Sequence, residues 1–386
     1  MIIAAVLAGF LLGRGGLDVI SLDPTSDFVS TLAVVALILI LFRDGLEVEA
    51  EMLQTAWRPP LRKLVVAMPV TAVLVALAAH VLTDLGWTEC FLIGALLSPT
   101  DPVLSSSVVT NPRVPRVIRH SLNLESGLND GLALPAVLAF ANSLDANEHG
   151  FVWWKFVLQD VSIGLVTGLV VGYLASRLRP RGGSFQALFA LAVGFLAYGV
   201  AVLPPHGNGL IAVFVCAIVL GVRRPEMRVW FEGRWDGLLA LVKLGVFLVF
   251  GSLLTLSALF GDGLAAVALV AFLLLVARPA AVFLALAGTR IDVATRAFMS
   301  WFGPKGVATM TFALLVLASD GIASRERIFN IAALAVLVSI ILHGITDAAG
   351  AEWIAARAER EERRGDLEHH IDGRRAQQAG GPAERS

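Results

Sequence analysis

The sequence has little charge, almost no cysteine and only two tyrosines. Lys, Arg, Asp and Glu make up 16% of its 386 residues, against about 25% in an ordinary soluble domain. The two cysteines, Cys90 and Cys216, lie in apolar segments and form neither a zinc spacing nor a disulfide framework. Because 57% of the residues are hydrophobic, the composition excludes a soluble enzyme, a disordered chain, a collagen and a coiled coil.

Long apolar runs alternate with short polar connectors over residues 1–350. One bilayer crossing takes about 20 apolar residues, so the sequence predicts an all-α, multi-pass membrane domain. A charged tail, 351–386, follows it, with a short helix expected outside the membrane at 352–368 and a disordered composition at its end. We predict twelve spans: 2–20, 27–43, 61–83, 89–110, 118–143, 154–178, 184–203, 208–222, 237–257, 263–287, 295–318 and 328–349.

The connectors between these spans differ in positive charge. Those that follow even-numbered spans hold sixteen Lys and Arg residues, whereas those that follow the third to eleventh odd-numbered spans hold three. Cytoplasmic loops of membrane proteins are enriched in Lys and Arg. The pattern therefore predicts that both ends of this chain, including the C-terminal tail, face the cytoplasm of a cell membrane.

Two of the predicted spans contain helix breakers near their middle. The fourth contains Ser-Pro-Thr-Asp-Pro-Val at 98–103 and the eleventh contains Gly-Pro-Lys-Gly at 303–306. Proline removes a backbone donor, and broken backbone is tolerated at membrane depth only where protein or a water-filled cavity satisfies it. Two ordinary proline kinks are one interpretation. Because each break also carries a charge, Asp101 or Lys305, the pair indicates the binding site of an inverted-repeat transporter.

The fifth span has the densest cluster of polar residues. Ser126 and Asp130 are four residues apart and share one helical face, which offers the oxygen ligands that a monovalent cation needs. Glu125 and Asn129 share another face, where we expect a hydrogen bond between them. A structural network that joins helices is the alternative, but an intramembrane acid such as Asp130 is by default a functional residue.

Other polar residues in the spans have weaker patterns. Lys243 in the ninth span either extends to the cytoplasmic surface or faces the site. His343 in the last span is interpreted as polar packing. The sequence contains no strand-associated glycine motif, catalytic triad, zinc motif or nucleic-acid footprint, so we predict no cofactor, no enzymatic activity and no nucleic-acid partner.

Four motifs together carry a resemblance to a known family. They are FRDGLEVE at 42–49, SPTDPV at 98–103, ESGLNDG at 125–131 and WFGPKGVAT at 301–309. In this order they resemble the monovalent cation:proton antiporters of the electroneutral NhaP/NHE-like branch over about residues 1–350. The resemblance implies two inverted six-helix repeats with two crossed discontinuous helices, a thirteenth linking helix and a homodimer.

The resemblance also implies an ion site. In the family, the aspartate at the position of Asp130 binds the cation and the proton alternately, next to the asparagine at Asn129. Ser126 contributes an oxygen, and Thr100 and Asp101 line the site. A sodium ion is thus expected at Asp130, Ser126 and Thr100.

Glu125 is expected, on the same resemblance, to pair with Lys305 of the second broken helix. Lys305 stands where the family more often has arginine, and Arg43 where it commonly has an acid, so Asp44 is a further possible site residue. Only twelve of the family's thirteen spans are visible. We therefore expect that the family's first helix is missing through truncation or a wrong start codon.

These patterns predict a secondary active antiporter that exchanges Na+, or Li+ or K+, for H+ by alternating access. One titrating carboxylate beside a neutral asparagine predicts one proton per ion and electroneutral exchange. The alternatives are a K+/H+ antiporter of the same fold, a symporter or channel on a similar fold, and a non-transporting membrane sensor or inactive paralogue.

Overall fold

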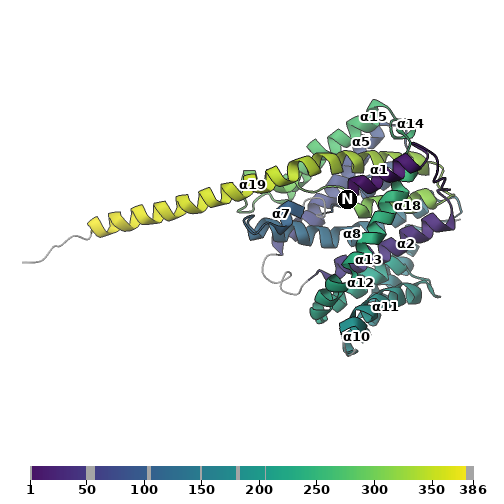
Figure 1. Cartoon of the computed structure of the whole chain (residues 1–386), viewed down its shortest axis with the longest axis horizontal. Coiled ribbons are helices and arrows are strands. Elements are labelled where there is room, and N and C mark those ends of the chain that lie inside the picture. Colours follow the sequence, from purple (N-terminus) through teal and green to yellow (C-terminus); the bar gives the residue numbers. More distant parts are fainter. Residues whose placement is uncertain are drawn as a thin grey trace, which may run out of the picture.

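The protein is a bundle of helices from which its last helix projects (Figure 1). The computed structural model describes residues 2–48, 57–101, 106–147, 150–179, 183–204 and 206–379, and these residues form no strand. The first half contains α1 Ile2–Leu12, α2 Asp27–Leu46, α4 Arg58–Arg62, η1 Lys63–Ala67, α5 Met68–Leu82, α6 Trp87–Leu97, α7 Ser106–Thr110, α8 Arg116–Leu144, α9 Trp153–Lys155, η3 Phe156–Val161 and α10 Ser162–Arg177. The second half contains α11 Gly183–Val202, α12 Gly209–Arg223, α13 Glu226–Ser252, α14 Leu256–Leu259, α15 Leu264–Phe272, η4 Leu273–Ala277, α16 Arg278–Ala285, α17 Val293–Trp301, α18 Val307–Ala318 and α19 Arg325–Ala379.

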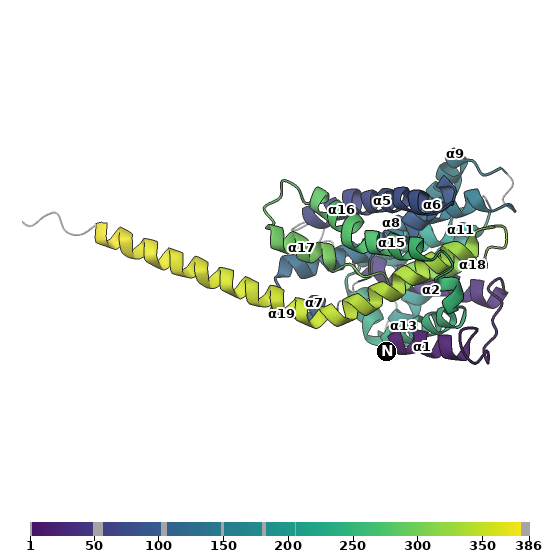
Figure 2. The ribbon, with the colours of Figure 1, turned by 90° about the horizontal axis from the view of Figure 1, so that it is seen from above.

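Many of the long helices run in nearly the same direction, as expected for a membrane bundle (Figure 2). Each predicted span overlaps one continuous or broken helix. Among the described residues, five helices are long and apolar enough to cross a bilayer by themselves: Asp27–Leu46, Arg58–Leu82, Trp153–Arg177, Leu264–Ala285 and Arg325–Arg360. The all-α membrane fold is therefore confirmed, whereas the exact number of crossings stays a prediction.

The first helix is shorter than the predicted span 2–20. Helix α1 ends at Leu12, and the chain then turns through a glycine-rich segment, 13–16. There the Arg14 amide donates to the carbonyl of Ser252 on α13, which replaces a bond within the helix. Glycine is a poor helix former, so the apolar residues beyond it do not extend the helix.

Two long spans widen into a π-helical turn directly before a proline. The turn η1 ends at Ala67, two residues before Pro69, and η4 ends at Ala277, two residues before Pro279. Proline has no amide hydrogen, and its ring collides with the carbonyl four residues earlier. A wider turn relieves that collision while the helix continues, and such turns often occur at functional sites. The two widened spans pack against each other through η1 and α16.

Helices α1 and α13 approach closely because glycines face the contact. A Cβ atom at Gly251 of α13 would overlap the backbone carbonyl of Val6, whereas nothing lies within 4 Å of a Cβ at Gly245 of the same helix. We expect Gly251→Ala to lower the free energy of unfolding by about 1–3 kcal/mol through overpacking. Gly245→Ala is the matched control and should unfold at the temperature of the parent or above it. Thermal unfolding in detergent measures the stability of both variants. An equal loss of stability in Gly251→Ala and Gly245→Ala would contradict the close α1–α13 contact.

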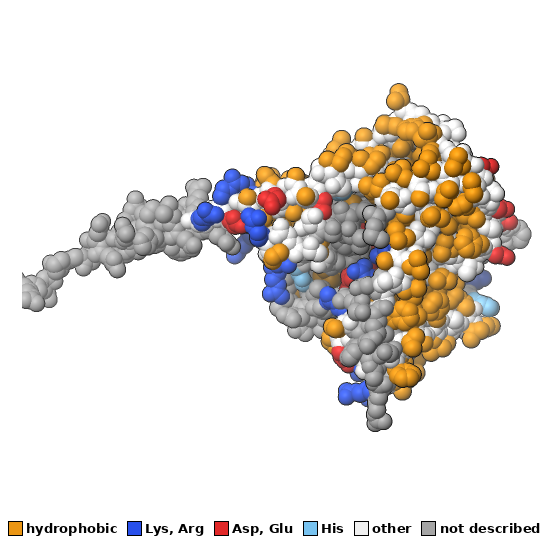
Figure 3. All heavy atoms as spheres, viewed as in Figure 1, with side chains coloured by type: hydrophobic (Ala, Val, Ile, Leu, Met, Phe, Trp, Pro, Cys, Tyr) orange, Lys and Arg blue, Asp and Glu red, His pale blue; other side chains and the backbone are white. Residues whose placement is uncertain are grey.

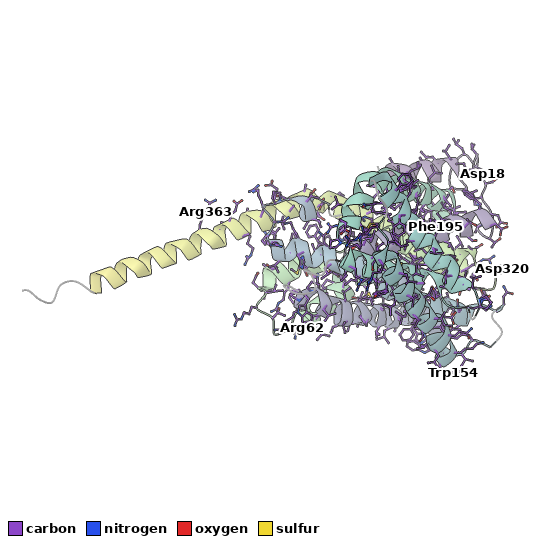
Figure 4. All side chains as sticks on the ribbon, turned by 90° about the horizontal axis from the view of Figure 1, so that it is seen from below. Asp18, Arg62, Trp154, Phe195, Asp320 and Arg363 are labelled. Carbon is purple, nitrogen blue, oxygen red and sulfur yellow. The ribbon has the colours of Figure 1, made fainter. Side chains whose placement is uncertain are left out.

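The surface of the bundle is mostly apolar, as a bilayer requires. Hydrophobic side chains cover much of the face seen in Figure 3, and many of its Lys and Arg side chains lie toward the end from which α19 projects. Arg62 and Arg363 lie toward that end in Figure 4, whereas Asp18 and Asp320 lie at the opposite end. The bundle thus has one basic end, and Arg62, at the start of the predicted third span, lies at that end.

Helix α19 continues without a break through the predicted boundary at residue 350. Beyond the bundle it contacts two connectors. Arg113 Nε donates to Glu359 at 2.9 Å, and Arg357 donates to Asp292 at 3.3 Å. The hydrogen bond from Arg113 holds the pKa of Glu359 below its usual value. The predicted short outer helix at 352–368 is therefore part of the last helix, and residues 380–386 lie outside the described part of the chain.

Candidate ion-binding site

The two predicted breaks meet in the middle of the bundle. One lies between the end of α6 at Leu97 and the start of α7 at Ser106, and the other between Trp301 of α17 and Val307 of α18. The backbone amide of Asp101 donates to the carbonyl of Pro304 at 2.8 Å, so the two extended segments are bonded to each other. Pro102 and Val103 of the first motif, and Glu49 of FRDGLEVE, lie outside the described residues.

Each broken helix supplies a charged side chain that compensates the opposite partial charge at an end of the other broken helix. Asp101 Oδ2 accepts a hydrogen bond from the backbone amide of Val307, the first residue of α18. Lys305 Nζ donates to the carbonyls of Pro99 at 2.9 Å and Ser98 at 3.2 Å, just beyond the end of α6. Helix N-termini attract negative charge and C-termini attract positive charge. The charges of the two motifs therefore stabilise the crossing.

Glycines allow the charged groups to approach this crossing. A Cβ atom at Gly306 would overlap the carboxylate of Asp101, and one at Gly303 would overlap the guanidinium of Arg278. Both glycines of Gly-Pro-Lys-Gly at 303–306 are therefore required sterically, because any larger side chain would collide with a neighbouring charged group. Arg278 itself is nearly inaccessible, and its Nε donates to the carbonyl of Ser300 near the end of α17.

Helix α8 brings Asn129 and Asp130 to the first break. Asn129 Nδ2 donates to both the carbonyl and the hydroxyl oxygen of Thr100 at 2.9 Å. Asn129 Oδ1 and Asp130 Oδ1 are buried and accept no hydrogen bond from any described residue. Buried oxygens are rarely left without a partner unless a ligand or water satisfies them. Two buried oxygen acceptors, on consecutive residues of α8, thus remain available for a cation or a proton.

A small cavity of about 10 Å³ lies between the two breaks and α8, next to Thr100. A cavity of that size holds about one water molecule. Ser126, one helical turn before Asp130, lines it together with residues of both breaks. The lining residues are Thr100, Asp101, Val109, Leu122, Ser126, Phe302, Gly303 and Pro304.

The predicted pair of Glu125 with Lys305 is wrong. Glu125 is 5% exposed and binds two other cations: Lys63 Nζ lies 2.5 Å from its Oε2, and Arg278 Nη2 lies 3.3 Å from its Oε1. Lys305 instead binds the carbonyls at the end of α6, as described above. The predicted hydrogen bond between Glu125 and Asn129 is also wrong, because Glu125 binds Lys63 and Arg278 while the Asn129 amide donates to Thr100 in the first break.

Sequence reasoning missed both partners of Glu125. Lys63 lies at the edge of the predicted span 61–83, directly after the basic Arg58 and Arg62, but in the structure it is at the first position of η1 and is 1% exposed. Arg278 stands within the apolar tenth span, at the start of α16. A charge inside an apolar run of that length marks a functional site by default, so Arg278 carried a signal that was not used.

Asp44 and Lys243 lie on helices that border the site. Asp44 of α2 is buried, and its backbone carbonyl lies 3.4 Å from the position of a Cβ on Gly127 of α8. Its carboxylate is 3.5 Å from the Arg43 guanidinium, which bonds more closely to Glu47. Lys243 of α13 is half-buried and near enough to act on the charges of Asp44 and Asp130. Both candidates therefore belong to the electrostatic surroundings of Asp130.

Two crossed, broken helices beside a buried carboxylate in a bundle of apolar helices define a multi-pass membrane protein with the inverted-repeat antiporter fold. The matching family model is described as "Sodium/hydrogen exchanger, transmembrane" and covers residues 1–350. The chain belongs to this sodium/hydrogen exchanger family. The resemblance inferred from the four sequence motifs is thereby confirmed.

Individual relatives agree with this assignment. A K(+)/H(+) antiporter NhaP of Alkalimonas amylolytica is 28% identical over 94% of this chain and 63% of its own length. A Na(+)/H(+) antiporter NhaG of Bacillus atrophaeus is 28% identical over 89% of this chain and 68% of its own. The chain thus spans about three fifths of the first of these relatives.

A solved structure shows the same fold. The sodium proton antiporter MjNhaP1 from Methanocaldococcus jannaschii superimposes with a TM-score of 0.80 at 18% identity, over 92% of this chain and 91% of the other. At this identity the likeness defines the fold alone, so the activity of this chain is inferred from its own site.

Proposed function

We propose that the protein is a secondary active antiporter that exchanges a monovalent cation for H+ at Asp130. The observation that carries the proposal is the unsatisfied pair of oxygens, Asp130 Oδ1 and Asn129 Oδ1, at the crossing of the two broken helices. Oxygen atoms are the ligands that hard cations bind, and a single buried carboxylate neutralises either a cation or a proton. The two occupants therefore exclude each other.

Three oxygen-bearing residues form the proposed cation site: Asp130 and Ser126 from α8, and Thr100 from the first break. Asn129 holds Thr100 in place through its two hydrogen bonds. Asp101 serves the site indirectly, because its carboxylate holds the start of α18. Alternating access then requires that only the loaded carboxylate moves between the two sides of the membrane.

Charge counting predicts electroneutral exchange. Asp130 is neutralised by the cation in one loaded state and by the proton in the other, while Asn129 does not titrate. Glu125 is bound by Lys63 and Arg278 and is not available as a second proton carrier. Both loaded states then carry the same charge, provided that Lys243 and Asp44 keep their protonation through the cycle. A membrane potential would leave the equilibrium unchanged.

Transport measurements in proteoliposomes test whether exchange is electroneutral. The membrane potential is clamped with K+ and valinomycin, a Na+ gradient is imposed, and the pH gradient at which net flux stops is determined. We expect the null point to stay the same at every imposed potential. A null point that moves with the potential would disprove one-for-one exchange, and Lys243→Met and Asp44→Asn would then be compared to find the second titrating group.

The preferred cation is a separate question, because the relatives named above are a K+/H+ and a Na+/H+ antiporter. We propose Na+ as the substrate, because the family whose model matches residues 1–350 is described as that of sodium/hydrogen exchangers. Dye dequenching in everted vesicles with chlorides of Na+, Li+ and K+ measures the order. A response to K+ alone would favour the K+/H+ alternative, and no response to any cation would favour a non-transporting sensor.

We further propose that the basic end of the bundle faces the cytoplasm of the cell membrane, and that the protein forms a homodimer within the lipid bilayer. The gathering of Lys and Arg near the base of α19 supports the orientation. Labelling of single cysteines at Asp18 and Arg363 with an impermeant reagent distinguishes the two faces: in intact cells only the Asp18 position should react.

A further inference from the structure

Helix α19 carries a polar strip on an otherwise apolar span. Ser339, His343, Thr346 and Asp347 are spaced so that they lie on one face of the helix. Ser339, His343 and Asp347 are buried. Polar side chains in a membrane helix need partners, and here these partners belong to the two broken helices.

The strip binds the backbone or the end of both discontinuous helices. Ser339 Oγ accepts from the amide of Lys305 at 2.8 Å, and Asp347 Oδ2 accepts from the amide of Ser107 in α7 at 3.0 Å. Thr346 Oγ1 accepts from the indole nitrogen of Trp301, the last residue of α17, at 3.0 Å. Helix α19 therefore holds the segments that flank the proposed ion site, while Ser339, Thr346 and Asp347 are not themselves among its proposed ligands.

His343 faces two carbonyl oxygens at once. Its Nδ1 lies 2.8 Å from the carbonyl of Ser339, and its Nε2 lies 2.8 Å from the carbonyl of Trp301. A neutral imidazole carries one N–H, whereas the imidazolium carries two. The charged form donates to both carbonyls. In the neutral form with the proton on Nε2, Nδ1 accepts instead from the Ser339 hydroxyl, whose oxygen lies 3.2 Å away.

The two protonation states act differently on Lys305. In the neutral state the Ser339 hydroxyl has His343 as its acceptor while its oxygen accepts from the Lys305 amide. Protonation removes that acceptor and adds a positive charge close to two cations, Lys305 and Arg278. Asp347, one turn further along α19, is the acid on the same face. A positive charge behind Lys305 disfavours a cation at the crossing by Coulomb repulsion.

We propose that His343 is a positioning residue that makes cation exchange sensitive to pH: its protonation through the Ser339 hydroxyl and Lys305 weakens cation binding at the crossed breaks. The inference rests on the proposed antiport function. It assigns to the last span a regulatory role that is distinct from the titration of Asp130. Exchange should accordingly decline on the acid side more steeply than Asp130 alone would cause.

The test compares the parent with His343→Gln, which can donate and accept but does not titrate. Exchange in proteoliposomes is measured at saturating and subsaturating Na+ from pH 5.5 to 9. We expect the ratio of the rate at pH 6 to that at pH 8.5, at subsaturating Na+, to rise about twofold to tenfold in His343→Gln, the equivalent of one net hydrogen bond. His80→Gln is the control, because His80 stacks on Trp87 away from both breaks, and its profile should match that of the parent.

A second readout does not depend on transport. The His343 ring stacks on Trp301 with centroids 5.3 Å apart, so the imidazolium should quench the fluorescence of Trp301. The pH titration of that signal, taken as the difference between the parent and Trp301→Phe, should show a step that His343→Gln lacks. If transport is absent but the pH-dependent step in Trp301 fluorescence is present, the proposed antiport function fails, whereas the protonation of His343 is supported.

Superimposable pH profiles of parent and His343→Gln, in rate and in fluorescence, would overturn the proposal. Should His343→Gln fail to fold, Ser339→Ala is measured in the same way. Loss of the hydroxyl removes the link to Lys305, so the acid-side rate ratio should again rise while the fluorescence step remains. An unchanged rate ratio in Ser339→Ala would equally contradict the mechanism.

Discussion

Replacement of Asp130 by asparagine is expected to reduce cation-dependent proton flux to the level of protein-free vesicles. The amide neither titrates nor neutralises a bound cation, so both loaded states are lost together. The fold should persist, because Asn is nearly the same size and a neutral group is cheaper to bury than a carboxylate. Thermal unfolding in detergent should therefore give a stability at least equal to that of the parent.

The matched control is Asp18→Asn. Asp18 lies in the connector after α1 with a φ of 51°, a backbone conformation that asparagine adopts as readily as aspartate. This variant makes the same chemical change far from the site and should exchange at the rate of the parent. Normal pH-dependent exchange by folded Asp130→Asn would mean that the proton and the cation are carried elsewhere, with Asp44 and Asp101 as the first positions to examine.

The second large effect is expected at Glu125. Glu125→Gln leaves Lys63 and Arg278, both almost fully buried, without the carboxylate that they share. Breaking a buried ion pair by removal of one partner typically costs about 3–5 kcal/mol. We expect a loss of this size in the free energy of unfolding, measured by thermal or denaturant unfolding in detergent, together with loss of exchange.

A double-mutant cycle decides between the observed and the originally predicted partner. Glu125→Gln is combined with Lys63→Met in one cycle and with Lys305→Met in another. Contacting residues show coupling of about 0.5–3 kcal/mol, so we expect strong coupling to Lys63 and weaker coupling to Lys305. Glu125→Gln/Lys63→Met should also be more stable than Glu125→Gln alone, since one unpaired cation is removed. The reverse order of the two coupling energies would contradict the assignment.

The elements of the site could be predicted from sequence where local spacing decides them. The four-residue spacing in α8 and the proline and glycine residues of the two breaks specify local backbone, and the breaks and the all-α fold are confirmed. Asn129 and Asp130 lie at the first break, as the motif order indicates. Local composition also accounts for the shorter α1, because the glycines at 13–16 end the helix within the predicted span 2–20.

Long-range pairing could not be predicted in the same way. The buried cations Lys63, Arg278 and Lys305 were all candidate partners of Glu125, and the choice among them depends on how three segments that are distant in sequence pack against α8. Lys63 follows Arg58 and Arg62 in sequence and resembles a connector residue until the helix is seen to begin at Arg58. One partner of His343, the carbonyl of Trp301, likewise lies 42 residues away in sequence, which no local pattern reveals.

Helix α19 is hydrogen-bonded to both broken helices and projects far beyond them. It spans 55 residues without interruption, or about 80 Å at 1.5 Å per residue. Roughly half of that length lies beyond residue 350. A tilt of about 10° at the base would displace its far end by roughly 7 Å, more than one helical turn. A fluorophore near Ala379 would therefore report in real time on rearrangements at the broken helices. A molecule that binds the projecting part of α19 outside the membrane would act on the ion site through a long rigid helix.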